Sequence, residues 1–242
     1  MTREAEIVRS LVEMADTLVD DYDVVDLLTG LTGRCVNLLG ASAAGVMLAG
    51  PSGRLGLVAS SSEAMRLLEL FELQAQEGPC LDAFHSGETV EHEILTAGSG
   101  RWLRFTRAAL QAGFHSAFAV PLRWRDRTLG ALNILSASPQ PMADADRIVT
   151  RAFADLAAVS IVQNRASAEA RRLNEQLSAA LSSRVVIEQA KGVISERASI
   201  SLADAFARLR RYARSNNLRL TDVAEDAVNG TLHQDAWRPP PG

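Results

Sequence analysis

Residues 115–136, HSAFAVPLRWRDRTLGALNILS, decide the fold of the first part of this chain. Apolar runs at 115–122 and 128–136 flank a short polar segment, which predicts two β-strands joined by a turn. Upstream, the runs 44–48 and 55–60 are joined by AGPSG, whose Pro and Gly are typical of a hairpin connection. The two strand pairs together predict a central antiparallel sheet.

Helical spacing of apolar residues predicts helices before and between these strands. We expect helices at residues 4–18, 24–39, 60–73 and 102–111, and a short extra strand at 89–93. This order of elements is typical of an α+β domain with a central antiparallel sheet, which we assign to residues 1–142.

The chain from residue 144 to residue 182 contains neither Pro nor Gly and is expected to form one helix. Its apolar and small side chains repeat at alternating spacings of four and three residues, in a seam made of Ala152, Leu156, Val159, Gln163, Ala166, Ala170, Leu173, Leu177 and Ala180. Such a repeat is typical of a coiled coil, which we assign to residues 143–182. A helix of about 40 residues runs about 60 Å, longer than either neighbouring domain covers, so we expect a homodimer. The alternative is a single helix that packs on its own domain.

Three short helices are expected after the coiled coil, at residues 183–197, 202–214 and 222–229. Ser201 and Asp204 have the spacing of an N-terminal capping pattern at the start of the second helix. These helices predict an all-α three-helix domain at residues 183–230, followed by a disordered tail at residues 231–242.

The composition is that of a globular protein, with 47% hydrophobic and 22% charged residues. No apolar stretch approaches the roughly 20 residues that a bilayer requires, and the N-terminus lacks the pattern of a secretory signal. We therefore expect a cytoplasmic protein with no membrane partner. The two cysteines lack CxxC spacing, which suits a reducing compartment. Cys80 follows Gly78 and Pro79 in a predicted loop, where it is either a reactive thiol or a small, half-buried side chain.

The charge is distributed unevenly along the chain. Residues 163–242 hold twelve Lys or Arg against nine Asp or Glu, although the whole chain has a net charge of −4. Lys191 is the only lysine in the sequence. A basic C-terminal third can attract a polyanion, and a solvated surface is the alternative.

Motifs for catalysis and metal binding are absent from the sequence. It contains no GxGxxG loop, no GxxxxGK[ST] loop, no GxSxG elbow and no HExxH pattern. The four histidines and two cysteines are scattered without the spacing of metal ligands. We therefore expect no enzymatic activity, no metal and no cofactor.

The segments SRVVIEQAKGVISER (183–197), AFARLRRYA (205–213) and LRLTDVA (218–224) closely resemble the ANTAR family of RNA-binding antiterminators. The match includes the family's core motifs in their order and spacing, which makes it specific. The resemblance implies RNA contacts from a set of basic residues and one glycine, namely Lys191, Gly192, Arg197, Arg210 and Arg214.

The physical chemistry of these residues agrees with that implication. Lys191 can meet a phosphate as a mobile point charge, and the arginines can pair with phosphate or stack on an unpaired base. Gly192 costs about 1 kcal/mol relative to alanine inside a helix, which indicates that another backbone or a ligand approaches there. The last two arginines of the set are four residues apart and share a helix face. For each arginine the alternative is a solvated face, most strongly for Arg208 and Arg211.

Residues 24–138 resemble the GAF sensory domains that precede ANTAR domains in actinobacterial regulators. The stretches that carry this resemblance are AGVMLA (44–49), VASSSE (58–63), LFELQAQEGPCLD (70–82), AGFHS (112–116) and LGALN (129–133). GAF domains bind cyclic nucleotides, tetrapyrroles, haem, small metabolites or nothing, so the ligand-binding residues stay unassigned. A cyclic nucleotide is disfavoured, because the signature of that subset requires a lysine and none precedes Lys191.

Both resemblances together imply a GAF-ANTAR transcription antitermination regulator. In this interpretation the GAF domain senses a small-molecule signal, and a homodimeric ANTAR domain binds paired stem-loops in nascent RNA. Two alternatives stay open. A GAF enzyme such as a sulfoxide reductase would need reactive cysteines gathered at one pocket, and a protein-interaction module would use the C-terminal helices to bind a protein partner.

Overall fold

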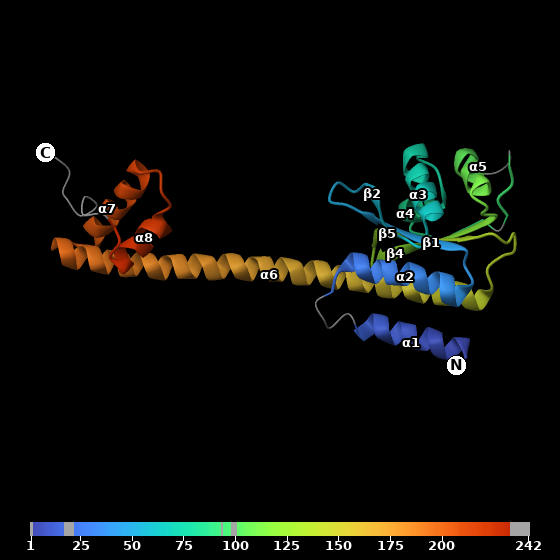
Figure 1. Ribbon diagram of the computed structural model, residues 1–242, viewed down its shortest axis with the longest axis horizontal. Helices are drawn as coiled ribbons and strands as arrows, with labels where there is room; N and C mark the ends of the chain where they lie inside the picture. Colours follow the sequence, from blue (N-terminus) through green and yellow to red (C-terminus); the bar gives the residue numbers. More distant parts are fainter. Residues whose placement is uncertain (1, 17–21, 93, 98–100, 233–242) are drawn as a thin grey trace. The chain divides into compact units, whose positions relative to one another are not determined.

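The computed structural model describes residues 2–16, 22–92, 94–97 and 101–232. The chain divides into two compact units, residues 1–167 and residues 168–242. Helix α6 (Asp144–Ala198) contributes to both units (Figure 1). No helix in the described part of the chain is long and apolar enough to cross a membrane.

The first unit is built around a five-stranded antiparallel sheet. Its strands lie in the spatial order β2 (Leu55–Ser60), β1 (Ala43–Ala49), β5 (Arg127–Ser136), β4 (Ser116–Trp124) and β3 (Val90–His92). The two predicted strand pairs form as hairpins, and β1 joins them by pairing with β5. The prediction of a central antiparallel sheet is confirmed.

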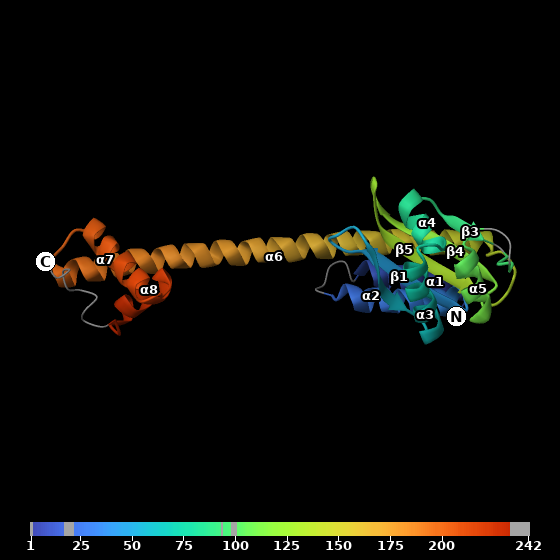
Figure 2. The same ribbon diagram turned by 90° about the horizontal axis from the view of Figure 1, so that it is seen from above.

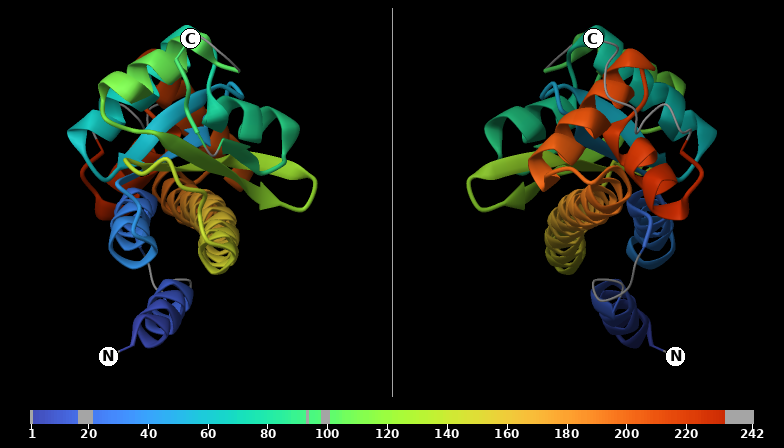
Figure 3. Two further views of the ribbon diagram at one scale, coloured as in Figure 1. Left: turned by 90° about the vertical axis from the view of Figure 1, so that its right-hand side faces the viewer. Right: turned by 90° about the vertical axis from the view of Figure 1, so that its left-hand side faces the viewer.

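One face of the sheet is covered by α2 (Val24–Leu39) and the first part of α6, and α1 (Arg3–Asp16) lies farther out (Figures 1 and 3). Phe153, Ala157 and Ile161 of α6 are fully buried in this layer, together with Leu28 and Leu31 of α2. The early part of α6 therefore packs on its own domain, as the alternative interpretation of the seam expected.

The opposite face is covered by α3 (Glu63–Ala75), α4 (Pro79–Ser86) and α5 (Leu103–Gln111), over a core that includes Met47 and Phe105. Helix α4 was not predicted, because Gly78, Pro79 and Cys80 were assigned to a loop. Proline is favoured in the first turn of a helix, and Pro79 is the first residue of α4. Ser62 caps α3 by accepting a hydrogen bond from the Met65 amide, so the helix begins at Glu63 and not at residue 60 as predicted.

The second unit consists of the end of α6, α7 (Leu202–Ser215) and α8 (Leu220–Asn229), which pack together (Figure 2). The predicted helix break between residues 182 and 183 is wrong. No glycine or proline stops the helix there, so α6 continues to Ala198 and supplies the first helix of the three. Leu232, placed in the predicted disordered tail, is buried in this core, and residues 233–242 lie outside the described residues.

The seam of α6 changes its environment along the helix. Ala152, Leu156 and Val159 are partly buried at the edge of the sheet layer, whereas every residue from 165 to 179 is exposed. Leu173 and Leu177 keep 55% and 60% of their surface accessible. Within the described part of this chain, nothing covers the second half of the seam.

Candidate functional site

A cationic group surrounds one aromatic ring where α6 and α7 meet. The Lys191 ammonium lies over the Phe206 ring at 5.6 Å from its centroid, and the Arg210 guanidinium lies over the same ring at 5.7 Å. The ring itself is only partly buried. Cations are attracted to the negative face of an aromatic ring, which holds both basic groups beside an accessible π-surface.

A shallow pocket of about 460 Å³ continues this surface along α7. Arg210, Arg211 and Arg214 line it, together with Phe206. For Arg211 the sequence left a solvated face open as the alternative, and the structure places it in the lining of this pocket. It is three residues from Arg214, and that spacing also places side chains on one face of a helix.

Lys191 is already engaged by an acidic neighbour. Its Nζ donates to both carboxylate oxygens of Glu188, at 2.9 and 2.8 Å, one helical turn earlier on α6. The lysine side chain is 19% exposed, so neighbouring groups cover most of it. A phosphate that approaches Lys191 must therefore compete with Glu188.

The remaining two residues of the predicted set lie in different surroundings. Gly192 is exposed, and a Cβ atom added there would meet no other atom within 4 Å. Arg197 lies at the end of α6, with Nη2 3.8 Å from the Cβ position of Gly230, which caps α8. The structure thus brings Lys191 and Arg210 together around Phe206, and it places Arg197 at the end of α8.

The first unit contains an acidic cluster that the sequence analysis did not identify. Glu69 and Glu72 of α3 are both fully buried against the sheet. Burial raises the pKa of Glu72 to about 8, although its Oε1 accepts a 3.1 Å hydrogen bond from the Leu81 amide at the start of α4. Burial, and then the charge of Glu72, raises the pKa of Glu69 well above its usual value.

Both cysteines are buried and unsuited to act as reactive thiols. Cys80 lies in the first turn of α4 rather than in a loop, and it is completely buried instead of half-buried. Burial, and then the charges of Glu72 and Glu69, raises the pKa of its thiol. Burial raises the pKa of Cys35 to about 12, and this residue belongs to the core on the other face of the sheet. A reactive thiol needs exposure and nearby positive charge, and neither cysteine has both.

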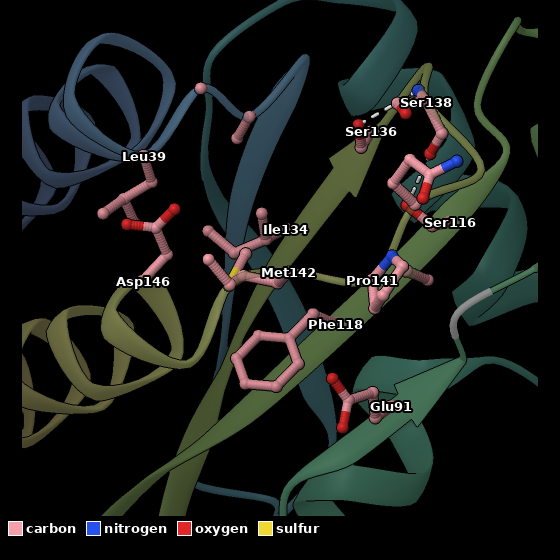
Figure 4. A pocket seen from close by; sticks show the side chains of 15 residues that line it. Leu39, Glu91, Ser116, Phe118, Ile134, Ser136, Ser138, Pro141, Met142 and Asp146 are labelled. Carbon is pink, nitrogen blue, oxygen red and sulfur yellow. Dashed lines mark hydrogen bonds between the residues drawn. The ribbon is translucent and has the colours of Figure 1, made fainter.

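A pocket of about 300 Å³ opens at one end of the sheet, beside the segment that leads into α6 (Figure 4). Phe118, Ile134 and Met142 lie close together in it, with the carboxylates of Glu91 and Asp146 on either side. Both carboxylates are paired with arginine side chains, Glu91 with Arg147 at 2.6 Å and Asp146 with Arg3. In the described ranges, no group of three His, Cys, Asp or Glu residues could hold a metal ion.

Comparisons with protein families identify both units. The GAF domain family matches residues 21–162, which is more than half of the 242 residues, and the ANTAR domain family matches residues 175–228. Among curated proteins, none matches the chain.

Solved structures support the fold of the first unit. The chain is similar to the phycocyanobilin-bound GAF domain of a cyanobacterial phytochrome, with a TM-score of 0.55, 15% identity and coverage of 69% of this chain and 97% of that one. It is also similar to free methionine-R-sulfoxide reductase from Neisseria meningitidis in complex with its substrate, with a TM-score of 0.53, 18% identity and coverage of 69% and 95%. At these identities, the likeness concerns the fold.

Proposed function

Because the chain belongs to the GAF domain family and continues into an ANTAR domain, we propose that it is a signal-responsive transcription antiterminator that acts in the cytoplasm. ANTAR is an RNA-binding antitermination domain, and GAF is a small-molecule sensor. The proposed target is a pair of stem-loops in nascent RNA, whose binding would prevent a terminator hairpin from forming. The observation that carries this proposal is the grouping of Lys191 and Arg210 over the accessible ring of Phe206.

Each member of this group suits a single-stranded RNA loop. Unpaired loop bases expose flat faces that stack on aromatic and guanidinium groups, at about 1–3 kcal/mol per base. Phe206 and Arg210 offer such faces, and Lys191 and Arg214 supply positive charge for the adjacent phosphates. Gly192 leaves the surface beside Lys191 open to the RNA backbone. Arg197 would make a separate phosphate contact near the end of α8.

Two ANTAR units would act together in a homodimer. The seam residues between 165 and 179 are exposed in this chain, and they keep the alternating spacing that a second copy of α6 can cover. Two linked units raise the effective concentration of the second at a neighbouring loop, so a pair of weak sites gives tight binding.

The test is a titration of a labelled tandem stem-loop RNA with the full-length protein at several salt concentrations. Lys191→Ala and Arg210→Ala should each weaken binding about tenfold, and Lys191→Ala, which removes a phosphate contact, should also lower the slope of log K against log salt by about one. Arg172→Ala, which removes an exposed charge from the linker part of α6, is the matched control and should change little. If the wild-type protein does not bind the RNA, or if the variants bind it as well as wild type does, the result would instead favour a protein partner for these helices.

A further inference from the structure

The face of the sheet under α3, α4 and α5 contains buried polar atoms that have no hydrogen-bond partner. They are both carboxylate oxygens of Glu69, Oε2 of Glu72, and both Nδ2 and Oδ1 of Asn133. All three side chains are completely buried. A buried polar group without a partner costs about 1–3 kcal/mol, and more when it is charged, so five such atoms in one layer require an explanation.

The register of the sheet places these groups next to each other. The carboxyl group of Glu69 occupies the position where a side chain of Gly45 would lie. Gly45 of β1 is the direct cross-strand partner of Asn133 of β5, and such partners hold their Cβ atoms about 4.5–5.5 Å apart on one face. On its other side, Asn133 pairs with Ala119 of β4. The Glu69 carboxyl group and the Asn133 amide are therefore neighbours among small residues.

The cluster is acidic and has no internal compensation. The charged group that acts on Glu69 is Glu72, and those that act on Glu72 include Asp82 but no basic side chain. Asp82 is itself paired with Arg101, at the surface. Without a positive charge nearby, burial keeps both carboxyl groups protonated, and a bound cation would offset the cost of ionising them.

From this geometry we propose that Glu69, Glu72 and Asn133 bind a small organic cation, of the alkylammonium or guanidinium class. Its N–H groups would donate to the oxygens of both carboxylates and to Oδ1 of Asn133. A metal ion fits less well, because among the described residues no three acidic, His or Cys side chains are placed to coordinate one. The inference rests on the proposed sensory role of the GAF domain, and it names the class of signal.

The test uses the full-length protein and simple probes. Methylguanidinium and butylammonium chloride carry the proposed positive charge, N-methylurea is the neutral counterpart of the first, and sodium chloride matches the ionic strength. Thermal unfolding followed by tryptophan fluorescence should show a concentration-dependent rise in Tm with at least one cation and none with N-methylurea. Isothermal titration should give saturable binding of that cation at one site per chain.

Glu69→Gln has the same shape as Glu69 without its charge, and it should abolish the rise in Tm. Glu63→Gln on the exposed side of the same helix is the matched control and should keep the rise in full. Glu72→Gln keeps the acceptor for the Leu81 amide, and it should weaken binding at least tenfold, so the test does not depend on one variant.

The proposal is overturned if neither cation shifts the wild-type Tm, or if Glu69→Gln and wild type respond equally. Either result means that water and a protonated Glu69 satisfy the cluster. RNA is absent from these measurements, so their failure leaves the proposed RNA binding standing. Failure of RNA binding would likewise leave a measured cation site intact.

Discussion

The buried carboxyl group of Glu72 should make the stability of the first unit fall as the pH rises. Its pKa is about 8 in the folded protein, compared with about 4.5 for an unperturbed glutamate. The folded state therefore holds a proton that the unfolded chain releases between these two values. Stability from this group is fully present below pH 4.5, decreases through the window and is lost above pH 8.

The size of the effect follows from the shift. One pKa unit corresponds to about 1.4 kcal/mol, so the free energy of unfolding should fall by about 2–3 kcal/mol from pH 5 to pH 7 through Glu72 alone. Glu69 acts in the same direction, because its pKa is raised as well. Substitution Glu72→Gln removes one titrating group while its side-chain oxygen still accepts from Leu81.

Urea unfolding at pH 5 and pH 7, followed by tryptophan fluorescence, measures this effect. Trp102 and Trp124 both lie in the first unit and report on its unfolding. The loss of stability between the two pH values should be about 2–3 kcal/mol smaller in Glu72→Gln than in wild type. Glu63→Gln, at an exposed position, should lose as much as wild type. Equal losses in wild type and Glu72→Gln would refute the assignment of Glu72 as a buried, protonated acid.

Three further changes test other parts of the structure. Gly45→Ala places a methyl group against the Glu69 carboxyl group and should cost about 1–3 kcal/mol in urea unfolding, whereas Glu69→Ala in the same chain should recover most of that cost. Glu188→Gln releases Lys191 from an ion pair worth about 0.3–0.5 kcal/mol, so RNA binding should tighten about twofold in the stem-loop titration. Leu173→Glu places a charge in the seam of α6 and should shift the proposed homodimer to monomer in sedimentation velocity, and an unchanged dimer would exclude the seam as the interface.

The strands and most helices of the first unit could be predicted because their signals are local. Apolar runs separated by a Pro- and Gly-containing connection in one hairpin and by a polar segment in the other defined the sheet, and helical spacing located α2 and α5. Helix α4 was missed by the prediction, because its first residue, Pro79, is also the strongest local sign of a helix end. The break expected at residue 183 had no local stop signal behind it, and a helix continues until one occurs.

The candidate sites depend on contacts that spacing reveals only in part. Glu69 and Glu72 follow Met65 at intervals of four and seven residues, which places both acids on the apolar stripe of α3 and could have indicated their burial. Their proximity to Asn133 arises from sheet pairing far along the chain. Phe206 and Arg210 share a helix face by spacing, but Lys191 reaches them only because α6 and α7 pack together.

Helices α4 and α5 begin without caps of their own. Gly78 and Trp102 supply no side-chain cap, and the first-turn amides donate to glutamates instead, Leu81 to Glu72 and Phe105 to Glu77, at 3.1 Å in each case. The N-terminus of each helix is thus capped by a glutamate from the segment 72–77, which precedes α4. Fraying of that segment would open both first turns at once, so their amide protons should exchange with solvent in step, as one cooperative folding unit.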